Sequence, residues 1–588
     1  MELLAPARDL DTLKAAFDAG ADAVYLGLKE FSARKRAKNF TEEELLQAEA
    51  IKKSLKKRIY VAINTVIFQD EIPQLIDMLA FLEAINVDAI IIQDYGLYEL
   101  IKTFTINIPL HASTQMGTKN HLQANFLKGL GFKRIVLERQ LTLSEIERIK
   151  KQSDIELEVF IHGALCFSLS GHCFFSKAFT DRSGNRGDCA QPCRWAFLNN
   201  AGKIEQPFSM KDLNGLSLLP SLIKMGITSV KIEGRMKGVD YVYPVVSAYR
   251  KAIDCAKEGN FDKKFIEEIE KELEYSTLSR KSDTGFFFFN QLKDDNRLIG
   301  DAGVGLLVGK VQSVTKTSLF FKTGFHLNVG DTVRIDNPKG DERYKIPVKA
   351  IYLNNEKVRT AQSGSFIGIP SNEPKIRAGF TVYLVHRRNN YRPKTLSIKP
   401  TPAVNFKERA LTLQRSYDAF LKALKKTVTT EHKLSFNPEK EIYSIDGKEF
   451  YFLPPTLYES DLSLYEKIKD MKIDGIIISH PAEAELAGNL IKAASFFLPS
   501  TNVFAIKFLE RLNVKVLSLS PDLSEKQFEL IRTYFPAWIR WQNTPCCISR
   551  VPLNSGLYRL KSLKNNAVTV KMVKDNCYIL RPLPFAKS

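Results

Sequence analysis

The segment Val87-Asp88-Ala89-Ile90-Ile91-Ile92 sets the pattern of the N-terminal half of the chain. A short run of β-branched apolar residues is typical of a strand that is buried on both faces of a sheet. Runs like this one alternate with amphipathic segments of helical spacing from Glu2 to about Ala256. Such an alternation predicts successive βα units and a parallel sheet.

Eight apolar runs of this kind occur in the N-terminal half of the chain. They are Leu3–Ala5, Ala23–Leu26, Ile59–Asn64, Ala89–Gln93, Leu110–Ala112, Arg134–Leu137, Glu156–Ile161 and Ser229–Ile232. Eight βα units are the number that closes a (β/α)₈ barrel, so we expect an α/β fold with a TIM-like barrel.

Functional groups of such barrels follow the carboxyl ends of the strands. The polar residues at those positions are Asn64, Asp94, Ser113, Glu138, His162 and Glu233. About half of these residues are expected only to cap the following helix.

The pattern changes between Gly300 and His386 to alternating β-branched and aromatic residues, interrupted by turn residues. The strand candidates Gly305–Val314, Thr317–Thr323 and Thr332–Ile335 predict a small antiparallel barrel or sandwich.

The C-terminal region repeats part of the first pattern. Residues 473–478 echo 87–92, and residues 504–525 echo 124–145 with order and spacing kept. We therefore expect a partial second α/β unit that derives from the first.

A chain of 588 residues is too long for one hydrophobic core, so several domains are expected. The predicted domains are a TIM-like barrel with the cysteine site over residues 1–295, a small β-rich barrel over 296–395 and a C-terminal partial α/β repeat unit over 396–588.

Lys and Arg number 85 against 66 Asp and Glu, a surplus of 19 that favours a polyanionic partner such as RNA or DNA. The N-terminus has no basic region followed by an apolar stretch, and no run is long enough to span a bilayer. We expect a cytoplasmic protein without a membrane partner. The sequence does not indicate its oligomeric state. In that reducing compartment, eight cysteines favour a metal or redox site over a disulfide framework.

Four cysteines, Cys166, Cys173, Cys189 and Cys193, lie within 28 residues directly after the seventh predicted strand. Six, fifteen and three residues separate them, and the segment contains several glycines. Four thiolates suit an iron–sulfur cluster or zinc. Only Cys189 and Cys193 have the close spacing of a zinc knuckle, which favours the cluster, with zinc and unliganded thiols as the alternatives.

The remaining cysteines have simpler interpretations. Cys255 falls in a predicted helix and is expected in the core, and Cys546, Cys547 and Cys577 lack convergent partners in the sequence.

Charged and imidazole side chains surround the cysteine segment. His162 and His172 are candidates for an acid, a base or a ligand, or are simply hydrogen-bonded within a crowded loop. Arg182, Arg186 and Arg194 would hold an anionic substrate near the site, unless they pair with Asp181 and Asp188.

Glu233 and Arg235 end the eighth predicted strand in the motif Val230-Lys231-Ile232-Glu233-Gly234-Arg235-Met236-Lys237. They are candidate substrate contacts, and a salt-bridged strand end is the alternative.

Five stretches of this chain resemble the collagenase-like family called peptidase U32. They are Glu2–Ala7, Gly20–Gly27, His111-Ala112-Ser113-Thr114-Gln115, Cys166–Cys193 and Lys231–Met236. With its β-rich insert and its C-terminal extension, the chain resembles the long-form branch of this family, which hydroxylates a cytidine of 23S ribosomal RNA.

The resemblance implies a [4Fe–4S] cluster on Cys166, Cys173, Cys189 and Cys193, and oxygen-independent RNA hydroxylation with prephenate as the hydroxyl donor. Shorter members make 5-hydroxyuridine in tRNA. We therefore expect RNA as the partner, with ribosomal RNA favoured over tRNA. The expected catalytic residues are His162, Glu233 and Arg235, and the expected substrate-binding residues are His111, Ser113, Gln115, Arg186 and Arg194.

Two other functions remain open. A peptidase would need an activated nucleophile or a hydrolytic metal, and the sequence contains neither a His-Glu-x-x-His motif nor a Gly-x-Ser-x-Gly elbow. A non-enzymatic RNA-binding or assembly factor would depend on basic residues and not on the cysteines.

Overall fold

The first half of the chain forms a closed barrel of eight parallel strands in the computed structural model. The strands are β1 (Glu2–Pro6), β2 (Ala23–Leu26), β3 (Arg58–Ile63), β4 (Ala89–Ile92), β5 (Leu110–Ala112), β6 (Arg134–Val136), β7 (Glu156–Ala164) and β11 (Ser229–Ile232). Each strand pairs in parallel with the next, and β11 closes the ring by pairing with both β7 and β1. The predicted TIM-like barrel is confirmed, and all eight strand candidates form its wall.

The structure describes residues 1–198, 201, 204–278, 281–288, 298–300, 305–338, 342–388, 391–392, 404–424, 430–435, 442–453, 455–535, 537–542, 545–550, 556–560, 567–573 and 576–580. Both predicted domain boundaries, 295/296 and 395/396, lie outside these residues. None of the described helices combines the length and the hydrophobicity needed to cross a bilayer.

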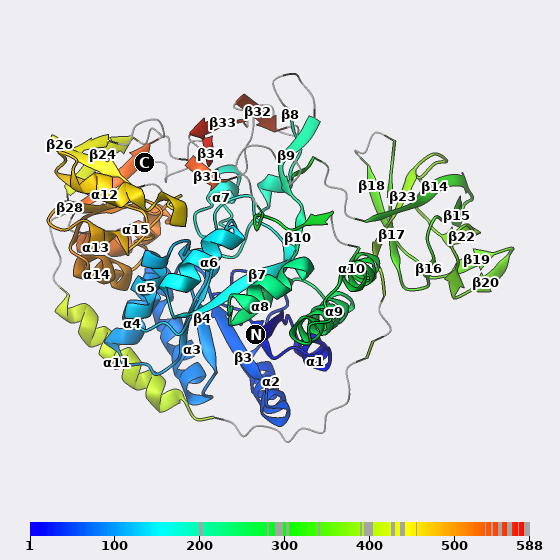
Figure 1. The fold of residues 1–588 in the computed structure, drawn as a ribbon, viewed down its shortest axis with the longest axis horizontal. Helices are drawn as coiled ribbons and strands as arrows, with labels where there is room; N and C mark the ends of the chain where they lie inside the picture. Colours follow the sequence, from blue (N-terminus) through cyan, green and yellow to red (C-terminus); the bar gives the residue numbers. More distant parts are fainter. Residues whose placement is uncertain are drawn as a thin grey trace.

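Helices surround the barrel on its outer side (Figure 1). They are α1 (Leu10–Asp18), α2 (Glu42–Leu55), α3 (Ile72–Ala84), α4 (Tyr95–Thr103), α5 (His121–Gly129), α6 (Leu143–Gln152), α8 (Leu219–Lys224), α9 (Val239–Lys257) and α10 (Lys263–Thr277). Capping boxes begin three of them: Asp9 and Thr12 cap α1, Thr41 and Glu44 cap α2, and Thr142 and Glu145 cap α6.

A small antiparallel sheet follows the barrel and encloses its own apolar core. Its strands in spatial order are β18 (Arg343–Pro347), β17 (Thr332–Asp336), β23 (Thr381–His386), β14 (Leu306–Val314), β15 (Ser318–Lys322), β22 (Phe366–Pro370), β19 (Ile351–Leu353) and β20 (Glu356–Val358). The three predicted strands correspond to β14, β15 and β17. Contacts between His386 and Asp240, at 3.2 Å, and between the stacked rings of Tyr391 and Tyr243 join this region to α9.

The C-terminal region contains a second, smaller α/β unit. Its sheet has the order β24 (Thr430–Ser435), β30 (Ala537–Gln542), β29 (Val514–Ser518), β28 (Ile491–Ala494), β27 (Gly475–Ile478), β26 (Lys448–Phe452) and β25 (Ile442–Ile445). Its helices are α11 (Lys407–Ala423), α12 (Ser463–Lys469), α13 (Glu483–Leu486), α14 (Val503–Arg511) and α15 (Glu525–Ile531).

Helix caps reproduce the predicted repeat. Asn502 caps α14 as Asn120 caps α5, each accepting a bond from the amide three residues on. Ser524 begins α15 with a capping box, as Thr142 begins α6. The internal echo seen in the sequence therefore corresponds to two similar α/β segments.

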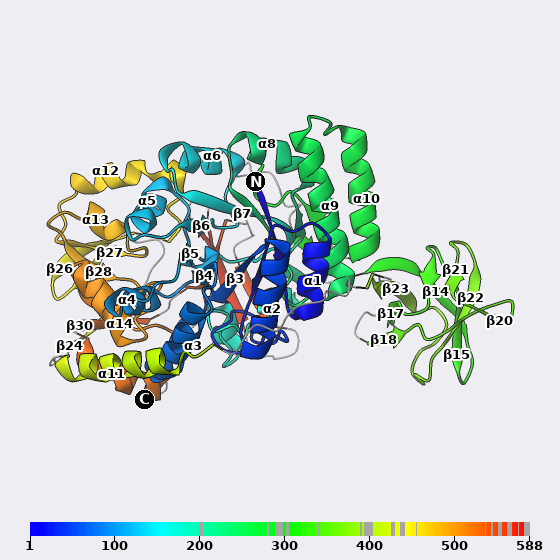
Figure 2. The ribbon, with the colours of Figure 1, turned by 90° about the horizontal axis from the view of Figure 1, so that it is seen from below.

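The second α/β unit packs beside the barrel helices α3 and α4 (Figures 1 and 2). The ring of Tyr95 on α4 stacks on Phe508 of α14 with centroids 4.9 Å apart.

A further sheet combines strands from two distant parts of the chain. Its order is β13 (Leu298–Gly300), β9 (Ile204–Met210), β8 (Phe197–Leu198), β32 (Gly556–Leu560), β33 (Ala567–Val573), β34 (Asn576–Leu580) and β31 (Pro545–Ser549). The C-terminal strands thereby lie beside the segment that carries the four cysteines.

Candidate active site

The cysteine segment follows β7 and folds over the carboxyl end of the barrel. Two glycines allow this close approach, because both adopt the left-handed backbone conformation with φ of +77°. A Cβ atom on Gly171 would lie 1.9 Å from the Gln115 carbonyl oxygen, and one on Gly187 would lie 2.2 Å from that of Ser32. Larger side chains at these two positions would therefore push the loop away from the barrel.

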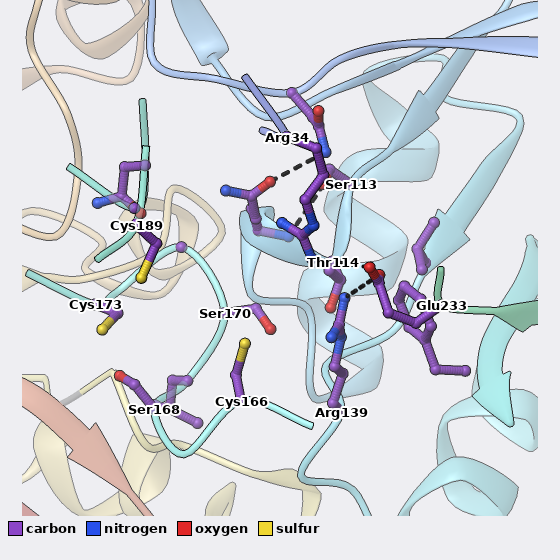
Figure 3. A pocket seen from close by; sticks show the side chains of 18 of the residues that line it. Arg34, Ser113, Thr114, Arg139, Cys166, Ser168, Ser170, Cys173, Cys189 and Glu233 are labelled. Atoms are coloured by element: carbon purple, nitrogen blue, oxygen red, sulfur yellow. Dashed lines mark hydrogen bonds and ion pairs between the residues drawn. The ribbon is translucent and has the colours of Figure 1, made fainter. Parts of the chain in front are cut away.

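All four predicted cysteine ligands line one cavity at the mouth of the barrel. Figure 3 shows the thiols of Cys166, Cys173 and Cys189 on one side of this cavity. Burial, together with the neighbouring Cys173 and Cys166, raises the pKa of Cys189 to about 11. Burial also raises the pKa of Cys193, although Arg194 opposes this shift.

Such mutual repulsion means that the four thiolates form together only when a cation compensates them, as in a metal centre. Within the described residues, no three His, Cys, Asp or Glu side chains converge closely enough to hold a single metal ion. The four thiols nevertheless line one cavity, and thiolates are ligands for both zinc and iron–sulfur clusters.

A fifth cysteine, Cys547 of β31, also lines the cavity. It hydrogen-bonds with Cys173, and this contact is the first cause that raises the pKa of the Cys173 thiol. The sequence had left Cys547 without a convergent partner, and this interpretation is wrong because strand β31 packs on the cysteine loop. The Leu169 amide donates to the Ile548 carbonyl at 2.9 Å, and the Phe174 amide donates to the Cys546 carbonyl at 2.8 Å.

Opposite the thiols, the cavity wall is basic. Arg34 and Arg139 donate to the two carboxylate oxygens of Glu233 at 3.1 and 3.4 Å. Burial alone would raise the pKa of Glu233, but Arg34, Arg139 and Arg235 outweigh it and lower the pKa to about 2. Three guanidinium groups thus surround one carboxylate, which leaves positive charge for an anionic ligand.

Arg139 has hydrogen-bonding capacity to spare in this wall. Its guanidinium carbon lies 3.9 Å from the centroid of the Phe160 ring, and its side chain is 8% exposed. Its Nε atom is buried without a hydrogen-bond partner in the structure. Lys231 lines the same cavity, but its Nζ is held by Glu158 at 2.9 Å. Arg139 also donates from Nη1 to the Ala164 carbonyl at 3.2 Å, so its Nε–H is a donor that remains for a further acceptor.

Amide and hydroxyl groups complete the cavity. Asn64 lies at the end of β3 and donates to the Gln115 side chain at 3.1 Å. Ser113 follows β5 and lines the same space. These groups offer neutral donors and acceptors beside the charged wall, where they would orient a polar substrate.

Of the predicted catalytic residues, Glu233 and Arg235 line the cavity, whereas the structure does not bring His162 there. His162 is buried, with Nδ1 3.2 Å from the Tyr249 hydroxyl, and burial lowers its pKa to about 3. His172 is likewise buried against the Ser170 carbonyl at 2.9 Å. Both rings therefore have structural partners.

Among the predicted substrate-binding residues, Ser113 and Gln115 line the cavity and His111 does not. His111 packs on the Tyr60 ring with centroids 4.7 Å apart, and its Nδ1 atom is buried without a partner. Burial, reinforced by Arg134, lowers the pKa of His111 to about 3.

The two predicted substrate-binding arginines also lie outside the cavity. Arg186 forms an ion pair with Glu71 and covers the Phe68 ring, with 4.1 Å between guanidinium carbon and ring centroid. Arg194 donates to the Ser209 hydroxyl at 3.0 Å and to the Leu165 carbonyl at 3.1 Å. Local partners therefore fix both side chains and hold the cysteine loop in shape.

Three of the six strand-end candidates, Asn64, Ser113 and Glu233, line the cavity. The other three have different roles: Asp94 caps α4, Glu138 accepts bonds from Ser170, and His162 bonds to Tyr249.

Arg34 and Arg139 were missed by the sequence analysis. Arg139 follows β6 by three residues, so the strand-end rule applies to it as well as to Glu138, which comes one residue earlier. Arg34 lies in a loop after β2, and no pattern in the sequence singles it out.

Together these features define a TIM-like α/β barrel with a cavity of clustered thiols and guanidinium groups at the carboxyl ends of its strands. Residues 8–297 match the sequence profile of peptidase family U32. The chain belongs to this family.

Three relatives have informative names. "Uncharacterized protease MJ0090" of Methanocaldococcus jannaschii is 36% identical over 66% of this chain and 98% of its own length. "tRNA hydroxylation protein P1" of Bacillus subtilis is 40% identical over 49% of this chain and 70% of its own length. "23S rRNA 5-hydroxycytidine C2501 synthase" of Escherichia coli is 35% identical over 58% of this chain and 52% of its own length, so the match spans about half of that protein.

Proposed function

We propose that this chain is an oxygen-independent, prephenate-dependent RNA hydroxylase that carries a [4Fe–4S] cluster. The observation that carries the proposal is the single cavity in which four thiols face a wall of guanidinium groups. The relatives named for RNA hydroxylation support the reaction class.

Cys166, Cys173, Cys189 and Cys193 would hold the cluster. When bound, such a cluster supplies an electron-transfer centre and an iron Lewis acid next to the substrate. The raised pKa of Cys189 and Cys193 supports this assignment, because a cationic centre is what would compensate their charge.

The guanidinium wall would bind the hydroxyl donor. Prephenate is a small dicarboxylate. Arg34, Arg139 and Arg235 line the cavity, and Glu233 is the carboxylate that these three positive charges share. Arginine binds carboxylates through paired, charge-assisted hydrogen bonds. Glu233 stays ionised and accepts one hydrogen bond from each of Arg34 and Arg139. It would therefore fix the orientation of both guanidinium groups.

The RNA base would enter beside Asn64, Gln115 and Ser113, whose amide and hydroxyl groups suit the edge of a pyrimidine. Apolar side chains of the same cavity, among them Phe160 and Phe167, would exclude water from the reacting atoms.

The favoured substrate is a cytidine of 23S ribosomal RNA. The match to the named cytidine synthase covers 58% of this chain, against 49% for the match to the tRNA hydroxylation relative. A tRNA uridine that becomes 5-hydroxyuridine is the alternative substrate.

Nucleoside analysis of RNA from a deletion strain tests the proposal. We expect one hydroxylated pyrimidine to disappear from ribosomal RNA and to return with the wild-type gene. Cys166→Ala and Cys193→Ala should not restore it, whereas Cys255→Ala, a change on α9 outside the cavity, should. An unchanged nucleoside profile of both ribosomal and transfer RNA in the deletion strain would refute the proposal.

Peptidase activity is the competing function, because one relative is named as a protease. Purified protein with a reconstituted cluster should hydroxylate RNA anaerobically only when prephenate is added, and it should leave collagen-derived peptides intact. Peptide cleavage that Arg139→Ala abolishes, without RNA hydroxylation in the same preparation, would favour the peptidase.

A further inference from the structure

The small antiparallel sheet exposes three aromatic rings on its outer face. In β15 the side chains of Leu319 and Phe321 are buried in the core, and Phe320 between them points outward. In β22 the same alternation leaves Phe366 50% exposed. Tyr352 of β19 is 36% exposed. We call Phe320, Phe366 and Tyr352 the aromatic platform.

The three rings occupy adjacent positions on neighbouring strands. Gly368 of β22 lies opposite Phe320 on one side and opposite Tyr352 on the other. A Cβ atom on Gly368 would lie 2.6 Å from Cε1 of Phe320, so the ring of Phe320 covers the glycine. The rings of Phe320 and Phe366 stack with centroids 6.2 Å apart and an interplanar angle of 19°. The two phenylalanine rings are therefore nearly parallel, and Tyr352 lies on the same face of the sheet, across Gly368 from Phe320.

Lysines flank the aromatic platform on the same face of the sheet. Lys322 is the cross-strand partner of Phe366, and Lys357 is the cross-strand partner of Tyr352. Both lysines are exposed. Residues 306–386 contain twelve Lys and Arg against six Asp and Glu, so the surplus of positive charge extends to the whole sheet.

We propose that the aromatic platform stacks unpaired bases of the RNA substrate while Lys322 and Lys357 contact its phosphates. Exposed rings with interleaved cations are the composition that binds single-stranded nucleic acid, because every base has a face to stack and every linkage has a charge. A partner protein would also cover aromatic rings, but lysine is depleted in the cores of protein interfaces. Charge complementarity therefore favours RNA.

The position of the platform limits the kind of RNA. Strands β15, β22, β19 and β20 lie on the side of the small sheet that faces away from the barrel (Figure 1), and Figure 2 shows the same for β15, β22 and β20. A ligand that contacts the platform and also reaches the cysteine cavity must be long. This inference rests on the proposed RNA hydroxylase function and makes its substrate a large RNA with an unpaired segment apart from the modified base.

Binding of fluorescently labelled pyrimidine-rich single-stranded RNA to the full chain tests the platform. Phe366→Ala and Tyr352→Ala should each weaken binding about tenfold, from a stacking free energy of about 1–3 kcal/mol per base. Leu411→Ala on α11, where the leucine is 58% exposed, is the matched control and should bind like the wild type. Binding of duplex RNA should change little in any variant. Thermal unfolding of each variant checks that the sheet is intact.

The outcomes separate this inference from the proposed function. If Phe366→Ala and Tyr352→Ala bind single-stranded RNA like the wild type, the platform inference is wrong, even where the wild type hydroxylates RNA. If both variants lose RNA binding but no preparation hydroxylates RNA, the aromatic platform binds RNA as inferred and the proposed hydroxylase function is wrong. A change in oligomeric state by light scattering, with RNA binding unaffected, would show that the rings contact protein and would overturn the inference.

Discussion

The thiol of Cys547 hydrogen-bonds with the thiol of Cys173, although one lies in the C-terminal sheet and the other in the loop after β7. The backbone of the same loop bonds to β31 at two further points. The C-terminal region is therefore part of the cavity wall, and the cavity cannot be complete without it.

Iron content distinguishes the four proposed ligands from this fifth cysteine. Cys189→Ala should abolish iron binding after anaerobic reconstitution, because three sulfurs remain for a cluster that needs four. Cys547→Ala should retain the iron, and Cys546→Ala on the same strand is the matched control. Iron analysis and visible absorption of the purified variants provide the measurement. Equal loss of iron in Cys547→Ala and Cys189→Ala would make Cys547 a ligand and contradict the assignment.

The contact between Cys547 and Cys173 is an example of a feature that the sequence did not predict. The barrel was predictable because each βα unit has a local sequence signature. Within about thirty residues, an apolar run indicates the strand and an amphipathic segment indicates the helix. The pairing of β31 with the cysteine loop depends on two segments from opposite halves of the chain. No local pattern encodes that register, so Cys547 was expected to have no partner.

The cavity itself was predictable in part for the same reason. The strand-end rule found Asn64, Ser113 and Glu233, since the direction of a parallel strand fixes where its last side chain points. The rule also selected His162, whose orientation depends on the Tyr249 ring from α9. The sequence alone did not show which polar side chains at the strand ends would bond to neighbouring residues and which would line the cavity.

Glu233 should stabilise the fold at neutral pH but not in acid. Its folded-state pKa of about 2 lies below the ordinary value of 4.5, so its ionised form is favoured by folding. This stabilisation is complete above pH 4.5 and is lost as the pH falls toward 2. Glu233→Gln should cost about 2 kcal/mol at neutral pH, since it leaves three guanidinium groups without their counter-charge.

Urea unfolding at neutral pH and near pH 3 measures the difference between wild type and Glu233→Gln. The gap between the two proteins should shrink at the lower pH. A gap of the same size at both pH values would mean that the ionisation of Glu233 does not support the fold.

Arg139 should bind the donor, and Arg186 should not. Arg139→Lys removes the planar fork and should weaken prephenate binding about tenfold, the loss expected for one charge-assisted hydrogen bond. Arg186→Lys loosens the pair with Glu71 and should cost about 1 kcal/mol of stability with donor affinity unchanged. Calorimetric titration of prephenate into reconstituted protein compares the two. If prephenate binding is weakened in Arg186→Lys and not in Arg139→Lys, the prediction from the sequence that Arg186 binds substrate would hold.

Asp522 of the C-terminal unit should keep the cysteine loop in place. Its carboxylate accepts bonds from the Ser183 hydroxyl at 2.5 Å and the Asn185 amide at 3.2 Å, and all three side chains are buried. Asp522→Ala leaves these two donors without an acceptor, which should cost about 2 kcal/mol. Since both donors belong to the segment that carries Cys173 and Cys189, the loop should open more often and release iron faster to a chelator.

The matched control for this change is Asp474→Ala in the same C-terminal unit. Asp474 accepts a bond from the Glu449 amide at 2.7 Å, away from the cysteine loop. This variant should lose stability without faster iron release, whereas Asp522→Ala should show both effects. The measurement is the rate at which absorption of the reconstituted protein decays in excess chelator. If the two variants release iron at equal rates, general destabilisation explains the effect, and the contact between Asp522 and the loop does not govern the metal centre.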